Sequence, residues 1–197
     1  KINKLTTMFT KGNLNKERLY YYLLDNLHIQ VEKWGKGGSK PFDSLVSEIE
    51  NGECTVDQAG VRRTKVVMAD VISDKVRLIE VKQVFSDGRE RKRQMSFGSL
   101  GEKMLPGENV FTTLNRMFEE EFKFHLFENF RHFRLDGPVY KINHRPSSSY
   151  PGLQNSAEEF RFVIHVDNQI RRILGQDQVV SVEQDKTTYF KWEDLKV

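Results

Sequence analysis

Two neighbouring carboxylates, Glu120 and Glu121, lie in a stretch whose apolar spacing predicts a helix. Side chains three and four positions apart share one face of a helix, so position 117 lies on the same face as both acids. Mg²⁺ prefers carboxylate oxygens as ligands. Position 117 holds a methionine, and its thioether is a poor ligand for a hard cation. The two carboxylates are therefore candidate ligands for a divalent cation, and Met117 adds no oxygen ligand to them.

Further residues upstream and downstream of the paired acids complete a known pattern. Glu108 is separated from Arg116 by the seven residues Asn109 to Asn115, and Phe118 and Phe124 fill bulky apolar positions. In this order and spacing, the segment GEKMLPGENVFTTLNRMFEEEFKF (101–124) resembles the Nudix box. Three positions depart from the family's pattern: Glu102 and Lys123 stand where glycines are expected, and Met117 stands where a glutamate is expected.

The resemblance implies the chemistry of diphosphate hydrolysis, in which divalent metals neutralise charge on the attacking and leaving oxygens. It assigns catalytic positions to Glu108, Arg116, Glu120 and Glu121, places a weak metal site at Glu120 and Glu121, and implies Mg²⁺ as the cofactor of an active enzyme. It also assigns Arg116 the role of bridging to Glu108. The apolar pattern of the helix extends onto Met117, which suggests that the metal-binding face of the family has become partly apolar.

Another carboxylate could replace the acid that is missing at position 117. The candidates are Glu102, Glu119, Glu158, Glu159 and Glu183. Glu119 lies two positions from Met117, on a different helix face, and is a poor substitute. Glu158 or Glu159 could serve as the distal acid that many Nudix enzymes recruit from outside the box, and the sequence leaves both open. The plain alternative is an amphipathic helix with a solvated acidic end.

The order of predicted elements indicates an α/β fold. Residues 1–60 are expected to form an N-terminal helical extension, with helices at 15–27 and 41–52 and with Trp34 as a packing anchor between them. Residues 61–197 are expected to form a Nudix-like domain, an α/β/α sandwich with a mixed sheet between helices. In TYFKWEDL (188–195), a strand followed by a short acidic helix resembles the closing segment of that fold.

Three further residues are candidates for substrate binding. Arg89 and Arg91 belong to the densest basic run, which follows a hairpin-turn signal at SDGR (86–89). The run either guards a sheet edge with solvated charge or contacts a phosphate-bearing ligand or RNA. Tyr150 lies in a turn after a serine run, near the place where a loop of the Nudix fold can cover the substrate groove.

Composition excludes several classes of protein. The chain has 197 residues and a formal net charge of +3, too mild to indicate nucleic acid or an acidic membrane by itself. The single cysteine, Cys54, excludes an internal disulfide framework, and the histidine spacing predicts no zinc site. No apolar stretch approaches a membrane span. We expect an intracellular protein, cytoplasmic or organellar after loss of a targeting peptide.

Two function classes follow. The first is a degenerate Nudix domain that acts mainly as a binding or scaffolding module in a larger assembly, which Met117 and the N-terminal helices favour. Protein partners are then expected, with a nucleotide or RNA as a further candidate ligand. The second is a divergent Mg²⁺-dependent diphosphohydrolase of nucleoside-diphosphate-linked substrates, favoured by Glu108, Arg116 and the paired acids.

Overall fold

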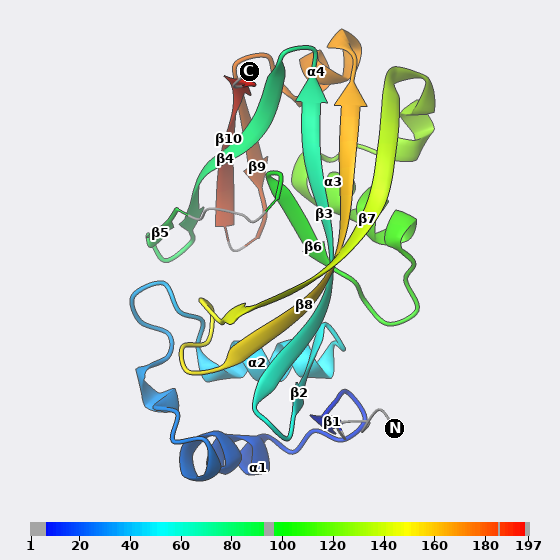
Figure 1. Ribbon diagram of the computed structural model, residues 1–197. Coiled ribbons are helices and arrows are strands. Elements are labelled where there is room, and N and C mark those ends of the chain that lie inside the picture. Colours follow the sequence, from blue (N-terminus) through cyan, green and yellow to red (C-terminus); the bar gives the residue numbers. More distant parts are fainter. Residues whose placement is uncertain (1–6, 93–96, 185, 196–197) are drawn as a thin grey trace. The chain divides into compact units, whose positions relative to one another are not determined.

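The computed structural model describes residues 7–92, 97–184 and 186–195, and these divide into two compact units. Unit 1 comprises Lys1–Lys65, Lys103–Gly107 and Lys141–Glu159, and unit 2 comprises Val66–Glu102, Glu108–Tyr140 and Phe160–Val197. The long strands β3 (Val61–Ser73), β7 (Phe133–Pro146) and β8 (Gln154–Val166) contribute residues to both (Figure 1). The predicted domain boundary at residue 60 stays a prediction.

The N-terminal part of unit 1 contains both helices and strands. Its elements are β1 (Thr7–Phe9), α1 (Lys16–Tyr21) with a π-helical continuation (Tyr22–Asn26), a 3₁₀ turn (Val31–Lys33), α2 (Phe42–Glu50) and β2 (Cys54–Asp57). Asn15 caps α1 by accepting a hydrogen bond from the Arg18 amide. The predicted helices are confirmed. The two strands were not predicted: β1 pairs antiparallel with β2, and β2 pairs with the first residues of β3.

Trp34 lies in the apolar core of unit 1, as predicted. Only 7% of its surface is exposed, its indole N–H donates to the Pro151 carbonyl at 2.9 Å, and its ring lies 5.2 Å from that of Tyr150. The apolar side chains of α2, Leu45, Val46 and Ile49, belong to the same core. The indole thus serves as a packing anchor, with its polar group satisfied by backbone.

A buried ion pair lies beside this core. Arg62 donates to Glu48 at 2.5 Å and to the Asn155 carboxamide oxygen at 2.7 Å. Burial acts to raise the pKa of Glu48, but the charges of Arg62, Lys103 and Lys40 outweigh it and hold that pKa well below its usual range. The neighbouring Cys54 thiol is buried, and burial raises its pKa to about 11.

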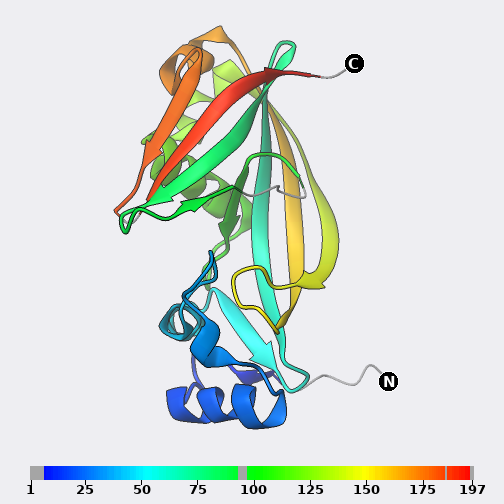
Figure 2. The same cartoon turned by 90° about the vertical axis from the view of Figure 1, so that its left-hand side faces the viewer.

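Unit 2 combines strands with helices. Besides its parts of β3, β7 and β8, its elements are β4 (Val76–Phe85), β5 (Glu90–Arg91), β6 (Leu100–Lys103, whose last residue belongs to unit 1), α3 (Val110–Phe122), a 3₁₀ segment (Leu126–His132), α4 (Asn168–Leu174), β9 (Gln178–Val182) and β10 (Lys186–Asp194). Strand β10 pairs antiparallel with β4 on one side and with β9 on the other (Figure 2). The predicted α/β class is confirmed, and a sheet with helices is consistent with a Nudix-like fold.

Two local predictions in unit 2 have different outcomes. The hairpin at 86–89 is confirmed, because β4 pairs with β5 and Gly88 has φ +82°. Part of the predicted return strand, residues 93–96, lies outside the described residues. The short closing helix is wrong for Glu193 and Asp194, which continue β10 opposite Arg77 and Val76. Strand pairing along β4 satisfies the backbone there and keeps it extended.

None of the helices in the described part of the chain has the length and apolar character that a membrane span requires.

Candidate functional site

Helix α3 carries the residues of the predicted site, and its start is fixed by its own sequence. Asn109 is the N-cap: its side-chain oxygen accepts hydrogen bonds from the amides of Phe111 and Thr112, at 2.9 and 3.0 Å. Gly107 in the preceding turn has φ +86°, a conformation that glycine adopts without steric cost. The helix buries Leu114, Met117 and Phe118 among other residues. Its remaining faces carry the polar and charged groups.

The Arg116 guanidinium lies among three carboxylates. It donates Nε to Glu108 Oε1 at 2.8 Å and Nη2 to Glu108 Oε2 at 3.0 Å, and Nη1 lies 3.2 Å from both Glu102 and Glu120. The bridge from Arg116 to Glu108 that the resemblance implied is therefore present. Thr113 also donates to Glu108, at 2.8 Å. The hydrogen bond to Glu108 is the main cause of the raised pKa of Arg116, with the other two carboxylates adding to it against burial.

The three positions of the predicted metal face differ in exposure. Met117 is 1% exposed and packs in the core, in agreement with the apolar character expected at this position. The Glu120 side chain is 47% exposed and contacts Arg116, whereas Glu121 is half-buried. Among the residues that the structure describes, no group of three histidine, cysteine or acidic side chains is arranged to hold a metal ion. The donor set does not fit Mg²⁺, because a buried thioether takes the place of a third carboxylate.

The candidate replacement acids have other contacts. Glu102 lies 3.2 Å from Arg116. Glu119 accepts from Asn115 and contacts His125 Nδ1 at 2.6 Å, on another face of α3. Glu159 belongs to unit 1, where it is 1% exposed and accepts from Asn143 at 3.0 Å, and Glu183 pairs with Lys186 at 2.5 Å. Glu158 also belongs to unit 1.

The three predicted substrate-binding residues lie in different surroundings. Arg89 and Arg91 both stack on the Phe85 ring, at 5.2 and 5.8 Å from its centroid, and Arg89 also pairs with Asp87 at 2.7 Å. They form a basic and aromatic surface at the hairpin of unit 2. Tyr150 is fully buried in unit 1, where the Arg62 guanidinium lies 5.5 Å from its ring. Its place is in the core.

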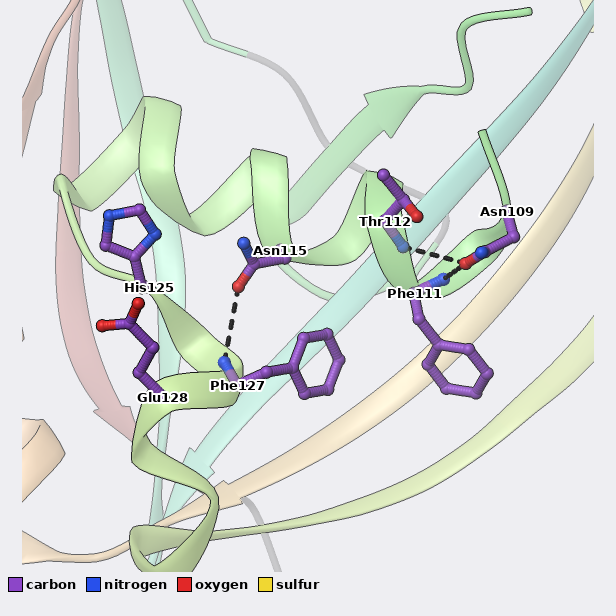
Figure 3. A pocket seen from close by; sticks show the side chains of 7 residues that line it. All are labelled: Asn109, Phe111, Thr112, Asn115, His125, Phe127 and Glu128. Atoms are coloured by element: carbon purple, nitrogen blue, oxygen red, sulfur yellow. Dashed lines mark hydrogen bonds between the residues drawn. The ribbon is translucent and has the colours of Figure 1, made fainter. Parts of the chain in front are cut away.

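A hollow of about 530 Å³ on another face of α3 was missed by the sequence analysis. It is lined by Asn109, Phe111, Thr112 and Asn115 from the start of α3, and by His125, Phe127 and Glu128 from the following segment (Figure 3). The Phe127 amide donates to the Asn115 side chain at 3.4 Å and ties the two segments together. In the segment after α3, Phe127 and Phe130 are 37% and 65% exposed. Spacing alone carried no sign of the hollow.

Comparison with known proteins found similar folds only. No protein-family model and no curated protein matches the sequence. Among solved structures, an Ap4A hydrolase from C. elegans in a binary complex is 11% identical, with a TM-score of 0.41 over 66% of this chain and 80% of that one. A Nudix hydrolase from Nitrosomonas europaea is 15% identical, with a TM-score of 0.34 over 66% and 72%. Both similar structures are hydrolases. Likenesses at this level of identity leave the function to the residues of the chain itself.

Proposed function

We propose that this chain contains a degenerate Nudix domain over residues 61–197, with an N-terminal extension, that acts mainly as a binding or scaffolding module in a larger assembly. The observation that carries the proposal is the place of Arg116 among Glu102, Glu108 and Glu120. A guanidinium supplied by the chain itself neutralises carboxylates that would otherwise need a bound cation. The box then serves as a structural ion-pair network.

The state of position 117 supports the same proposal. A metal ligand must present its donor atom to the ion, whereas Met117 is buried among apolar side chains. Metal-positioning groups typically contribute about 10²- to 10⁴-fold in rate, which corresponds to roughly 3–6 kcal/mol of transition-state stabilisation. The substitution of one such ligand removes a contribution of that size from hydrolysis.

A divergent Mg²⁺-dependent diphosphohydrolase is the second candidate, with nucleoside-diphosphate-linked substrates. The observation that favours it is the exposure of Glu120. Its carboxylate contacts Arg116 but is still accessible to solvent. In that case Glu120 and Glu121 would bind the metal, and Glu108 and Arg116 would fix the segment before the helix. A metal ion would then have to displace the Arg116 guanidinium from the Glu120 carboxylate.

Metal binding and hydrolysis separate the two candidates. Isothermal titration with Mg²⁺ and Mn²⁺, and assays with ADP-ribose, dinucleotide polyphosphates and capped RNA, should give neither binding at Glu120 nor turnover in the wild-type chain. A wild-type protein that binds metal, loses it in Glu120→Gln and turns over one of these substrates contradicts the proposal. Met117→Glu should create metal binding if the rest of the site is intact, and Met117→Leu, which keeps the apolar face, is its matched control.

The surface around Phe85 is our candidate contact for a nucleotide or RNA ligand. It joins two guanidinium groups to an aromatic ring, the combination that contacts phosphates and stacks on bases. Filter binding of a single-stranded RNA should weaken in the Arg89→Ala, Arg91→Ala double variant. Lys36→Ala changes an exposed lysine of unit 1 and should leave binding unchanged. Equal RNA binding by the wild type, the double variant and Lys36→Ala would show that the RNA does not bind at this surface.

A further inference from the structure

We propose that the hollow lined by Phe111, Phe127, His125 and Glu128 binds an arginine side chain of a partner protein. The proposal goes beyond the function proposed above, because the hollow is lined by none of the four predicted catalytic residues and its test measures neither metal nor hydrolysis. The argument rests on three features: ring surface, charge and hydrogen-bonding character.

The aromatic wall is exposed, and further rings pack against it. Phe111 and Phe127 are 47% and 37% exposed, and their centroids lie 6.3 Å apart at an interplanar angle of 72°. Phe162 supports the first ring at 5.8 Å and Phe133 supports the second at 6.1 Å. Rings held from behind present their free surface to a ligand without losing further freedom on binding. Planar cations, above all guanidinium groups, stack on such rings.

The polar end of the hollow carries negative charge. His125 and Glu128 lie together at one end of the hollow, with the two rings towards the other (Figure 3). Glu128 is exposed and forms no ion pair within the described part of the chain. Among the described residues, those that line the hollow include no lysine or arginine. Charge complementarity therefore selects a cation.

The polar end of the hollow offers a carboxylate as hydrogen-bond acceptor. His125 Nδ1 lies 2.6 Å from Glu119, and a carboxylate only accepts, so Nδ1 carries a proton that is directed at Glu119. The Glu128 carboxylate likewise only accepts hydrogen bonds. At the start of α3 the Asn109 side chain already accepts from the Phe111 and Thr112 amides, so these are not available to an anion.

Only a few ligand groups satisfy all three features. A guanidinium is planar and cationic, has five donors and accepts no hydrogen bond, so it matches the rings and Glu128 together. A phosphate lacks donors and carries the wrong charge. A lysine ammonium matches the charge but lacks the planar surface.

The test uses the full chain and small probes of the arginine side chain. N-acetyl-arginine amide is titrated into ¹⁵N-labelled protein and followed by amide NMR shifts, with N-acetyl-citrulline amide as the neutral isostere and N-acetyl-lysine amide as the non-planar cation. Saturable shifts at Asn115, Phe127 and Glu128 are expected for arginine, with a dissociation constant below about 10 mM, and at least threefold weaker binding for the other two probes. Equal binding of arginine and citrulline, or no saturable shift with arginine, overturns the proposal.

Two variants keep the test independent of folding. Glu128→Gln changes one exposed carboxylate and should weaken arginine binding about three- to tenfold. Glu17→Gln changes an exposed carboxylate of α1 in unit 1 and should leave the affinity as in the wild type. A Glu128→Gln protein with wild-type spectra and wild-type affinity contradicts the inferred site.

Discussion

Arg116 and Glu108, eight residues apart, form a bidentate ion pair with N–O distances of 2.8 and 3.0 Å. The Arg116 side chain is 20% exposed and that of Glu108 is 14% exposed, so solvent screens the pair only in part. The pair fixes the turn before α3 to the second turn of the helix. The same guanidinium also contacts Glu102 and Glu120, so the conformation of this turn depends on the ion pairs of the box.

Loss of the Glu108 charge should destabilise the fold. Glu108→Gln removes the anionic partner of Arg116 and of the Thr113 hydroxyl, and we expect unfolding to become easier by about 2–3 kcal/mol. Glu120→Gln is the matched control, because its 47% exposed carboxylate should contribute less than about 1 kcal/mol. Urea denaturation measures both. Equal losses in the two variants would contradict the role assigned to Glu108.

Lys123 ends α3 in a left-handed conformation, with φ +54° and ψ +38°. This is the position at which the Nudix pattern has glycine, and a side chain there costs about 1–2 kcal/mol that glycine avoids. Lys123→Gly should therefore raise stability by up to about 1 kcal/mol, after the larger entropy of the unfolded glycine is counted. Thermal denaturation measures it. Lys123→Ala keeps the Cβ and should give no such gain.

The buried Glu48 carboxylate should make the protein sensitive to acid. Its folded-state pKa is depressed, so its contribution to stability is present above about pH 4.5 and is lost as the pH falls towards the folded pKa. Free energies of unfolding should therefore fall steeply from about pH 5 to pH 3 in the wild type. Glu48→Gln should be less stable at neutral pH by about 3–5 kcal/mol, because Arg62 loses its partner, and should show a flatter pH profile. Identical profiles would exclude Glu48 as the titrating group.

The thiol of Cys54 should be inert in the folded protein. Burial raises its pKa to about 11, and only the thiolate reacts with a disulfide reagent such as DTNB. Reaction at about pH 8 should be at least about 100-fold slower in the native chain than in denaturant. The denatured protein is the control. Rapid stoichiometric reaction of the native protein would show that the site opens without unfolding.

Local patterns in the sequence predicted the local structure well. Apolar spacing predicted α2 and α3, and the SDGR signal predicted the turn between β4 and β5. Each of these depends on contacts between residues close in the chain, which the sequence displays directly. The strands β1 and β2 were missed. Strand β1 pairs with residues far along the chain, whereas β2 also pairs with the nearby start of β3, and such short strands depend on their pairing context.

The environment of the site residues could not be derived in the same way. Tyr150 was expected near a ligand but is buried against Trp34 and Arg62, two residues far from it in sequence. The closing residues Glu193 and Asp194 were expected in a helix, but pairing with β4 keeps them extended. Long-range packing and strand pairing override local preference at such positions.

The sequence by itself determined the box: the order of Glu108, Arg116, Glu120 and Glu121, and the methionine at position 117. Only the tertiary structure decided that Arg116 lies among three carboxylates, that Met117 is buried, and that Phe111 and Phe127 share a hollow with Glu128. The physical reason is that spacing along a helix fixes which side chains share a face, whereas burial and partners depend on what the rest of the chain packs against that face.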